Sequence, residues 1–284
     1  MSRLSGNGFL TAPCRTVPTM GTDYNGSKVL VTGASSGIGI GLAEEFARRG
    51  AVLAISGRDR DRLAATAAAC RAHGATVHEL VADLSDADAV DALAADTLAA
   101  LGGVDILVNN AGIPKRRHTR ELDAATIDAV MQVNFLGPIR LTLALLPQML
   151  ERGSGQLINV SSVAATLSSP GEAAYDASKA ALSVFSEAMA MDLWGDNIKV
   201  LVVYPGVVDT PLFTLPDNDP FTAPVEFITV GQFVEETFAA LDRGALEVYV
   251  PAHFKDYVTG KANDVEGFVK GTAEYMRQQA ADAK

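Results

Sequence analysis

Short apolar segments alternate with alanine-rich helical segments along this chain, and this alternation constrains the fold more than any other feature. The apolar segments are residues Lys28–Val31, Ala51–Ser56, Thr76–Val81, Val104–Asn109, Gln156–Val160, Lys199–Tyr204 and Glu247–Val250. Segments of this kind are typical of strands buried on both faces, which occur in parallel sheets. The pattern therefore predicts an α/β fold with helices on both faces of a parallel sheet and a ligand crevice at the carboxyl ends of the strands.

A glycine-rich turn, Thr32–Gly39, connects the first predicted strand to a predicted amphipathic helix. Its glycines, Gly33, Gly37 and Gly39, are not spaced as in the commoner Gly-x-Gly-x-x-Gly fingerprint. Glycine lets the backbone approach a ligand closely, and a helix N-terminus offers free N–H groups and positive charge to a pyrophosphate. The turn predicts a dinucleotide phosphate site. The alternative is a glycine-rich connection that binds nothing.

Tyr175 and Lys179 lie four residues apart in the segment Tyr-Asp-Ala-Ser-Lys. Residues at this spacing are neighbours on a helix, where an ammonium group would stabilise the ionised phenol and lower its pKa from about 10. The pair predicts an acid and base for carbonyl chemistry. Taken alone, the same spacing more often marks a core aromatic beside a solvated lysine, so the prediction depends on the glycine turn upstream.

Composition and charge narrow the class of partner. The chain has 284 residues and 48% hydrophobic content, enough for one domain with a large core. Its net charge of −11, without a long basic run, argues against nucleic acid or an anionic membrane and favours a small molecule. No apolar run approaches the roughly 18 residues of a membrane span, and no secretory signal is evident, so a cytoplasmic protein is expected. Neither a disulfide framework nor a metal site is expected from the cysteines and histidines Cys14, Cys70, His73, His78, His118 and His253.

The chain is expected to form one domain over residues 25–284, preceded by a disordered extension over residues 1–24 with Met20 as a possible alternative start. A lid is predicted over about residues 207–227, and its apolar residues suggest an apolar substrate: Pro211, Phe213, Leu215, Pro216, Phe221 and Pro224. A helical tail is predicted over about residues 252–284. Its aromatic residues could pack on the domain, cover the pocket or contact another subunit: Phe254, Tyr257, Phe268 and Tyr275.

With these motifs the chain resembles the classical short-chain dehydrogenases/reductases from about Lys28 to about Val250. Ser162 precedes Tyr175 by 13 residues, as in that family, whereas Ala165 replaces a glycine that many members have. The resemblance implies a doubly wound Rossmann-type three-layer α/β/α fold with a mainly parallel seven-stranded sheet in the order 3-2-1-4-5-6-7. It implies an NAD(P)-dependent oxidoreductase that transfers hydride between the nicotinamide cofactor and a carbonyl or alcohol substrate, as an alcohol dehydrogenase or carbonyl reductase does.

The resemblance also assigns site residues. The catalytic residues would be Asn134, Ser162, Tyr175 and Lys179. Tyr175 would donate the proton, Ser162 would hold the carbonyl oxygen, and Lys179 would hold the nicotinamide ribose; Asn134 would continue a proton relay through water. The cofactor-binding residues would be Gly33, Ser35, Ser36, Gly37, Ile38, Gly39, Arg58, Asp83, Leu84, Asn110, Ala111, Gly112, Tyr175, Lys179, Pro205, Gly206, Val208 and Thr210.

The end of the second predicted strand bears on the choice of cofactor. NAD sites usually place an acidic side chain there for the ribose 2′-hydroxyl, whereas a 2′-phosphate needs a cation. The sequence at this position is Ser56-Gly57-Arg58. Arginine suits bidentate phosphate recognition, so NADP(H) is preferred and NAD(H) stays possible. A solvated arginine is the alternative, and Ser36 lacks the second basic residue that some NADP-dependent members carry.

The sequence is also compatible with other functions. A catalytically silent nucleotide-sensing protein would share the fold, while an extended-branch epimerase or dehydratase is disfavoured by the glycine spacing. The basic run Lys115–His118 could steer an anionic group, but a solvated loop is the favoured interpretation. The helical segments Asp123–Leu150 and Ala174–Trp194 resemble the family's subunit interface, so a homotetramer or homodimer is expected.

Overall fold

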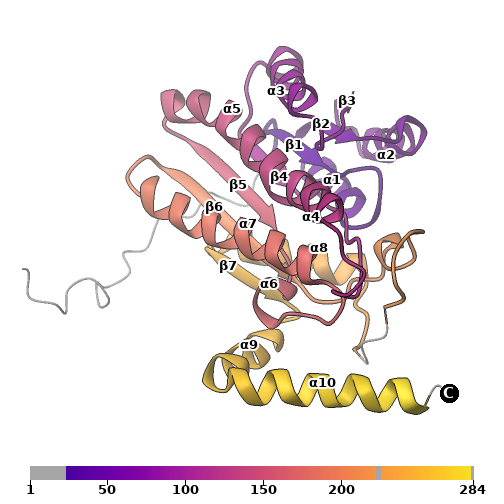
Figure 1. Ribbon diagram of the computed structural model, residues 1–284. Coiled ribbons are helices and arrows are strands. Elements are labelled where there is room, and N and C mark those ends of the chain that lie inside the picture. The colour runs from indigo at the N-terminus through magenta and orange to yellow at the C-terminus, as the bar shows by residue number, and fades with distance from the viewer. Residues whose placement is uncertain (1–23, 222–224, 283–284) are drawn as a thin grey trace, which may run out of the picture.

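The computed structural model describes residues 24–221 and 225–282, and in them seven parallel strands form one sheet in the order β3-β2-β1-β4-β5-β6-β7. Helices lie on both sides of this sheet (Figure 1). The expected doubly wound Rossmann-type fold and strand order are confirmed. The strands are β1 (Lys28–Thr32), β2 (Val52–Gly57), β3 (Val77–Val81), β4 (Ile106–Asn109), β5 (Gly155–Val160), β6 (Ile198–Pro205) and β7 (Glu247–Val250).

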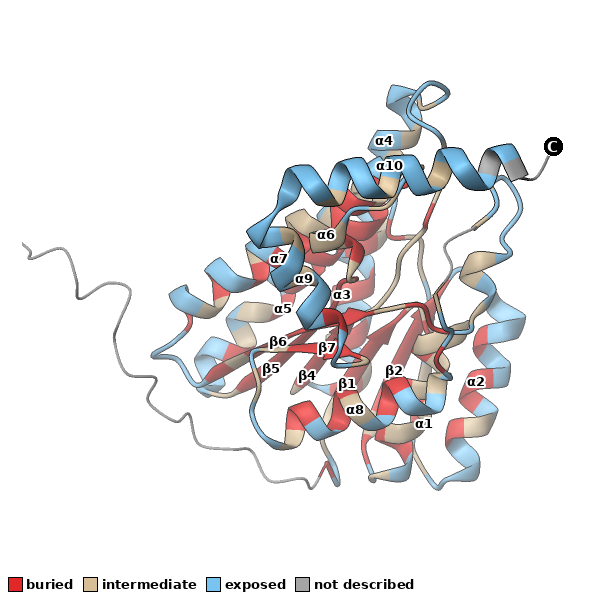
Figure 2. Cartoon of the chain, turned by 90° about the horizontal axis from the view of Figure 1, so that it is seen from below, coloured by how far each residue is buried: buried red, intermediate tan, exposed pale blue. Residues whose placement is uncertain are grey.

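The helices divide into two layers because successive strand residues point to opposite faces. Val29 and Val31 contribute to the core under α1, α2 and α8, whereas Leu30 contributes to the core under α3, α5 and α7. In Figure 2 the strands are red between these layers. The helices are α1 (Gly37–Arg48), α2 (Arg60–Ala72), α3 (Ala87–Leu101), α4 (Ala124–Met131), α5 (Gly137–Arg152), α6 (Ala164–Leu167), α7 (Ala173–Asp192), α8 (Val230–Asp242), α9 (Phe254–Asn263) and α10 (Val265–Asp282).

Local capping sets where several helices begin. Asp59 accepts a hydrogen bond from the backbone N–H of Arg62 at the start of α2, and Asp86 caps α3 in the same way. Thr229 and Gln232 form a capping box at the start of α8. These side chains satisfy N–H groups that have no partner within the helix, so each helix begins at a defined residue.

A π-helical turn, Gln132–Leu136, joins α4 to α5 and places Asn134 in the middle of one continuous helical segment. This segment, Ala124–Arg152, is long and apolar enough to cross a membrane by length and composition, contrary to the expectation of no such run. Half of its most apolar window is buried inside the fold. A single helix of this kind is weak evidence for a membrane span, because core helices of soluble proteins pass the same test.

Tyr24 corrects the predicted domain boundary, which placed it in the extension. The residue is 7% exposed, and its ring meets those of Phe46 and Phe238 edge-on at centroid distances of 5.3 and 5.7 Å. Aromatic pairs at this geometry stabilise a core beyond their buried area, so the fold begins at Tyr24 or before it. Cys14, Met20 and Pro224 lie outside the described residues.

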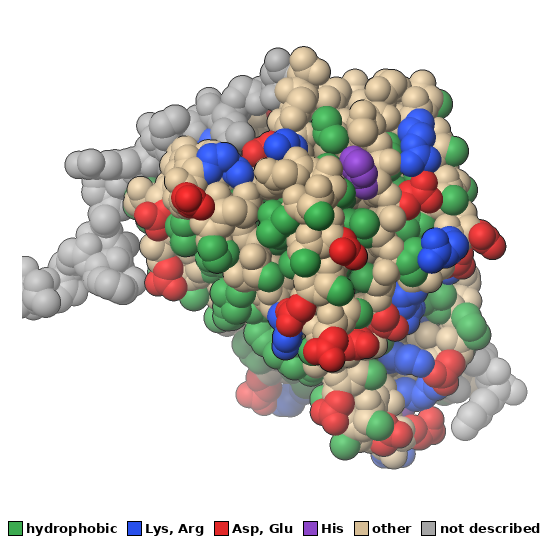
Figure 3. Space-filling view, turned by 90° about the horizontal axis from the view of Figure 1, so that it is seen from above, with side chains coloured by type: hydrophobic (Ala, Val, Ile, Leu, Met, Phe, Trp, Pro, Cys, Tyr) green, Lys and Arg blue, Asp and Glu red, His purple; other side chains and the backbone are tan. Residues whose placement is uncertain are grey.

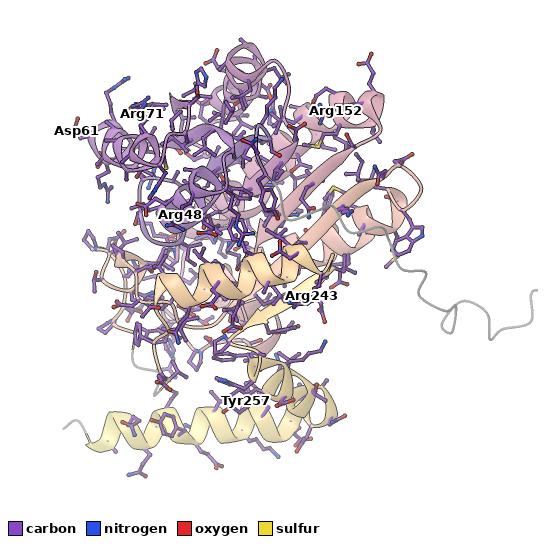
Figure 4. The ribbon with its side chains drawn as sticks, turned by 180° about the vertical axis from the view of Figure 1, so that it is seen from behind. Arg48, Asp61, Arg71, Arg152, Arg243 and Tyr257 are labelled. Atoms are coloured by element: carbon purple, nitrogen blue, oxygen red, sulfur yellow. The ribbon has the colours of Figure 1, made fainter. Side chains whose placement is uncertain are left out.

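The C-terminal helices lie at one end of the sheet, where Phe254 of α9 packs into the core. Figure 1 shows α10 as a long straight helix beside α9, and most of it is pale blue in Figure 2. Tyr257, labelled on α9 in Figure 4, is largely exposed.

On the face shown in Figure 3, lysines and arginines are interspersed with acidic side chains and do not gather into a basic patch.

Candidate active site

A cavity of about 510 Å³ opens at the carboxyl ends of the strands. The turns after β1, β2, β3, β4, β5 and β6 line it, together with the lid and α10. Every predicted cofactor residue lines this cavity except Gly39, and so do Ser162, Tyr175 and Lys179. Asn134 does not line it. The sheet therefore gathers residues from six separate stretches of sequence around one space.

The glycine turn is shaped so that side chains would not fit. A Cβ on Gly37 would lie 2.9 Å from Thr210 Cγ2, and Gly37 has φ of +52°. A Cβ on Gly39 would lie 2.2 Å from the carbonyl oxygen of Gly33, so Gly39 serves packing of α1 against the turn. The N-cap of α1, Ser36, makes no side-chain cap, and the first turn has no acidic residue. The uncapped helix N-terminus beside the cavity fits a pyrophosphate.

The loop after β4 is tied to β1. Asn110 Nδ2 donates to the carbonyl oxygens of Thr32 and Gly33 at 2.9 and 3.3 Å, and Thr32 Oγ1 accepts from the backbone N–H groups of Asn110 and Ala111. These bonds hold the Asn-Asn-Ala-Gly segment against the glycine turn. The glycine turn and the β4 loop, which both line the cavity, are thus fixed relative to each other.

Tyr175 lies in the first turn of α7, opposite Ser162 at the end of β5. Burial raises the pKa of Tyr175, and the negative charge of Glu172 raises it further, while a hydrogen bond with the Ser162 hydroxyl acts in the opposite direction. The phenol is therefore protonated at neutral pH. A protonated phenol beside a hydroxyl that can both donate and accept is suited to supplying a proton to a carbonyl oxygen.

The pKa of Tyr175 is not lowered beside Lys179 as the sequence predicted, because burial raises it instead. Lys179 Nζ lies 5.8 Å from the centre of the Tyr175 ring and donates to the carbonyl oxygen of Val160 at 2.8 Å. Burial lowers the pKa of Lys179 itself to about 8. The prediction failed because helical spacing brings two side chains near each other without deciding which partner the ammonium group selects.

Asn134 is completely buried and acts through other residues. Its Nδ2 donates to the carbonyl oxygen of Ile113 and to Ser178 Oγ, both at 3.0 Å, and its Oδ1 accepts from Ile113 N at 2.8 Å. A Cβ on Gly112 would lie 3.3 Å from Asn134 Oδ1 and 3.4 Å from Lys179 Nζ. The amide thus joins the π-helical turn to the β4 loop and to α7, and its role in a proton relay stays a prediction.

Arg58 directly follows β2 at the rim of the cavity, and its side chain is 64% exposed. Its Nη1 lies 4.0 Å from a carboxylate oxygen of Asp83, whose other oxygen accepts from Ser85 N and Oγ. The neighbouring acid, Asp59, is occupied in capping α2 and pairs with Arg62. The acidic residue that directly follows Arg58 is therefore occupied, which agrees with the sequence argument.

The basic loop is not solvated as expected. Arg116 is buried, and its Nε and Nη2 donate to the carbonyl oxygens of Asp219 and Phe213 in the lid at 2.9 and 3.0 Å. Lys115 and Arg117 both pair with Asp217, also in the lid. The loop therefore holds the lid, and lid acids neutralise two of its charges. A basic run in the sequence carried no sign of these distant partners.

Several cavity residues were not assigned a site role from sequence. Glu172, three residues before Tyr175, and Arg116 supply charge, while Phe254 from α9 and four side chains of α10 add mostly apolar surface: Phe268, Thr272, Tyr275 and Met276. The tail therefore covers the pocket, one of the possibilities left open. The α10 residues recur at helical spacing, a signal that predicts one shared face but not what the face meets.

The family model of the short chain dehydrogenases matches residues 27–219, which contain the glycine turn, Ser162, Tyr175 and Lys179. The chain belongs to the short-chain dehydrogenase family. A fatty acyl-CoA reductase of Acinetobacter baylyi is 37% identical over 192 residues, which cover 67% of this chain and 65% of that protein. The chain spans about 61% of the length of the first curated relatives that it matches.

Solved structures of this family share the fold over most of the chain. A short-chain dehydrogenase of Sphingobium yanoikuyae in complex with NADPH is 31% identical, with a TM-score of 0.75, covering 87% of this chain and 95% of that one. A short-chain dehydrogenase/reductase of Burkholderia phymatum in complex with NAD is 26% identical, with a TM-score of 0.78, covering 86% and 95%. Both nicotinamide dinucleotides thus occur among the structural neighbours.

Proposed function

We propose that this short-chain dehydrogenase is an NADP(H)-preferring alcohol dehydrogenase or carbonyl reductase that acts on an apolar substrate. The observation that carries the proposal is the meeting of Ser162, Tyr175 and Lys179 on the wall of a cavity whose other end is the glycine turn. A phosphate site and a proton donor in one cavity serve a reaction between a dinucleotide and a second molecule. The silent sensor has no observation in its favour.

The chain's own residues would handle the proton. NADPH bound in this cavity would supply hydride to the carbonyl carbon, and the carbonyl oxygen would then require a proton. Tyr175 holds one, because burial first and the Glu172 charge second raise the pKa of its phenol. Ser162 would hold the carbonyl oxygen beside that phenol and stabilise its developing charge. In the oxidising direction the same residues would accept the proton.

Arg58 supports the preference for NADP(H). It lies exposed at the cavity rim where a ribose 2′-phosphate would lie, and its acidic partner Asp83 is 4.0 Å away. Exposed pairs at this distance are worth little, so the guanidinium is available to a phosphate. The NADPH complex of the Sphingobium relative agrees with this choice, and the NAD complex of the Burkholderia relative marks the alternative.

The substrate end of the cavity supports an apolar carbonyl compound. Apolar side chains of the lid and the tail line it: Leu212, Phe213, Leu215, Phe221, Phe254, Phe268 and Met276. Burial of an alkyl chain against such a surface contributes about 0.8 kcal/mol for each methylene group. The Acinetobacter relative is a fatty acyl-CoA reductase, and a fatty acyl chain belongs to the same apolar class.

We also propose that the protein is a cytoplasmic homotetramer or homodimer without a nucleic-acid or membrane partner. Leu143 on α5 and Val184 and Met191 on α7 are exposed, at 55%, 65% and 72%. Apolar side chains exposed on neighbouring helices are typical of a subunit interface. Light scattering at micromolar concentration tests the assembly, and a monomer would contradict it.

The decisive experiment follows NADPH oxidation, with NADH in parallel, across ketones, aldehydes, quinones and acyl thioesters. Tyr175→Phe should abolish turnover while NADPH still binds, and Tyr257→Phe, which changes an exposed tyrosine on α9, should not. Arg58→Ala should lower kcat/KM with NADPH at least about tenfold and leave NADH nearly unchanged. Turnover that survives Tyr175→Phe would refute the proton donor, and NADPH binding without turnover of any carbonyl would favour the sensor.

A further inference from the structure

A buried charge pair lies on the cavity wall close to the proton donor. Arg116, from the loop after β4, and Glu172, immediately before α7, have side chains that are 4% and 9% exposed. Two nitrogens of the guanidinium, Nε and Nη2, donate to lid carbonyl oxygens. The third, Nη1, is buried and has no hydrogen-bond partner. Its distance to Glu172 Oε1 is 3.8 Å, beyond the roughly 3.2 Å of a hydrogen bond.

An unpaired buried donor is costly, so the chemistry of the two side chains indicates which ligand group would satisfy it. That group must accept a hydrogen bond from Arg116 Nη1 and donate one to the carboxylate of Glu172. A hydroxyl group does both at once. A carboxylate would be repelled by Glu172, an ammonium group by Arg116, and a methylene group would leave Nη1 unsatisfied. The pair therefore selects a neutral hydroxyl.

The position of the pair relates this hydroxyl to the reacting carbonyl. Glu172 is the N-cap residue of α7, three residues before Tyr175, and its negative charge raises the pKa of the Tyr175 phenol. Both side chains and Arg116 line the same cavity, among the apolar side chains of the lid and α10. A substrate whose carbonyl lies at the Tyr175 phenol would thus place a group a few carbon atoms away beside Arg116 and Glu172.

We propose that Arg116 and Glu172 form a hydroxyl-binding subsite, and that the substrate is an apolar carbonyl compound with a hydroxyl group a few carbon atoms from the carbonyl. The inference rests on the proposed carbonyl reductase function and adds the substrate class. Arg116 has a second role, because the same guanidinium holds the lid through Phe213 and Asp219. Changes at Glu172 therefore give the cleaner test.

The test compares 4-hydroxy-2-nonanone with 2-nonanone, using kcat/KM with NADPH for each enzyme. The wild type should favour the hydroxyketone at least about tenfold, which corresponds to about 1.4 kcal/mol. Glu172→Leu removes the acceptor and should bring the ratio near one, while Glu172→Gln retains an acceptor and should give an intermediate ratio. Glu187→Gln, an exposed change further along α7, is the control and should keep the wild-type ratio. The ratio within each variant is independent of the folded fraction.

A binding measurement covers the case of slow chemistry. Calorimetry in the presence of NADPH should show tighter binding of 2,4-nonanediol than of 2-nonanol to wild type, and Glu172→Leu should remove the difference. Equal kcat/KM for the two ketones, or a ratio that survives Glu172→Leu, would overturn the subsite and leave the reductase standing. Absence of Tyr175-dependent turnover, with the diol still preferred in binding, would instead refute the proposed function and keep the subsite.

Discussion

Asp176, the residue after Tyr175, is expected to destabilise the fold at alkaline pH. Its Oδ2 accepts from Ser169 N at 2.7 Å, but its Oδ1 is buried without a hydrogen-bond partner. Burial is the largest cause that raises its pKa from the usual 3.8 to about 7, and the charge of Glu172 acts in the same direction against the N–H of Ser169. The folded chain thus holds a proton that the unfolded chain has released.

The sign and size of the effect follow from this difference. Between pH 3.8 and about 7 the folded state binds more protons than the unfolded state, so stability falls as the pH rises through this window. Each pH unit corresponds to about 1.4 kcal/mol, so the loss accumulates to about 4 kcal/mol at pH 8 and about 2 kcal/mol at pH 5. Asp176→Asn keeps the acceptor for Ser169 and removes the charge.

The assay is urea denaturation of wild type and Asp176→Asn at pH 5 and pH 8, with Asp96→Asn, an exposed change in α3, as the control. The Asp176→Asn variant should exceed the wild type in free energy of unfolding at both pH values, and by about twice as much at pH 8. The control should change it by less than about 0.5 kcal/mol. An equal gain at the two pH values, or a loss at pH 8, would refute the assignment of a buried, unpaired carboxylate.

Three further outcomes are expected. Gly37→Ala should weaken NADPH binding at least about tenfold in a fluorescence titration, because the added Cβ would lie 2.9 Å from Thr210 in a left-handed backbone. Gly271→Ala is the control and should leave binding unchanged, because there is open space around Gly271. Equal effects of the two changes would contradict the turn geometry. Tyr24→Ala should lower the free energy of unfolding by about 3 kcal/mol and Tyr257→Ala by less than about 1, and similar losses would place Tyr24 outside the core. The free energy of unfolding of the wild type should rise with pH between about 8 and 10.5, because Lys179 releases its proton in the folded chain and keeps it in the unfolded chain. Lys179→Met should lack that rise. An unchanged dependence of stability on pH in this variant would assign the titration to another group.

Much of the fold was predictable because its signals are local. Strands buried on both faces must be continuously apolar, so β1, β5 and β7 begin and end within a residue of the predicted segments. The glycine turn was readable for a similar reason, since Gly33 and Gly37 occupy left-handed backbone and neither has room for a side chain. Residues at the carboxyl ends of parallel strands gather at one edge whatever their separation in sequence. Most of the predicted cofactor residues therefore line the cavity.

The errors concern groups whose partners lie far away in the sequence. Arg116 is buried because carbonyl oxygens about 100 residues later in the lid meet its guanidinium, and a run of basic letters cannot show this. Lys179 and Tyr175 are helical neighbours, yet the lysine donates to Val160 on the adjoining strand. Tyr24 was assigned to the predicted disordered extension, but its ring packs against Phe46 on α1 and Phe238 on α8.

By itself, the sequence determined the layered α/β fold, the family and the position of the glycine turn, because each depends on repeated local patterns and on backbone conformations that few residues can adopt. Only the tertiary structure decided the environment of Tyr175. Burial of Tyr175, the charge of Glu172 beside it and the unpaired Nη1 of Arg116 arise where the lid, α7 and the β4 loop meet. A pKa or an unsatisfied donor depends on which groups share a low-dielectric space, and that is a property of packing in three dimensions.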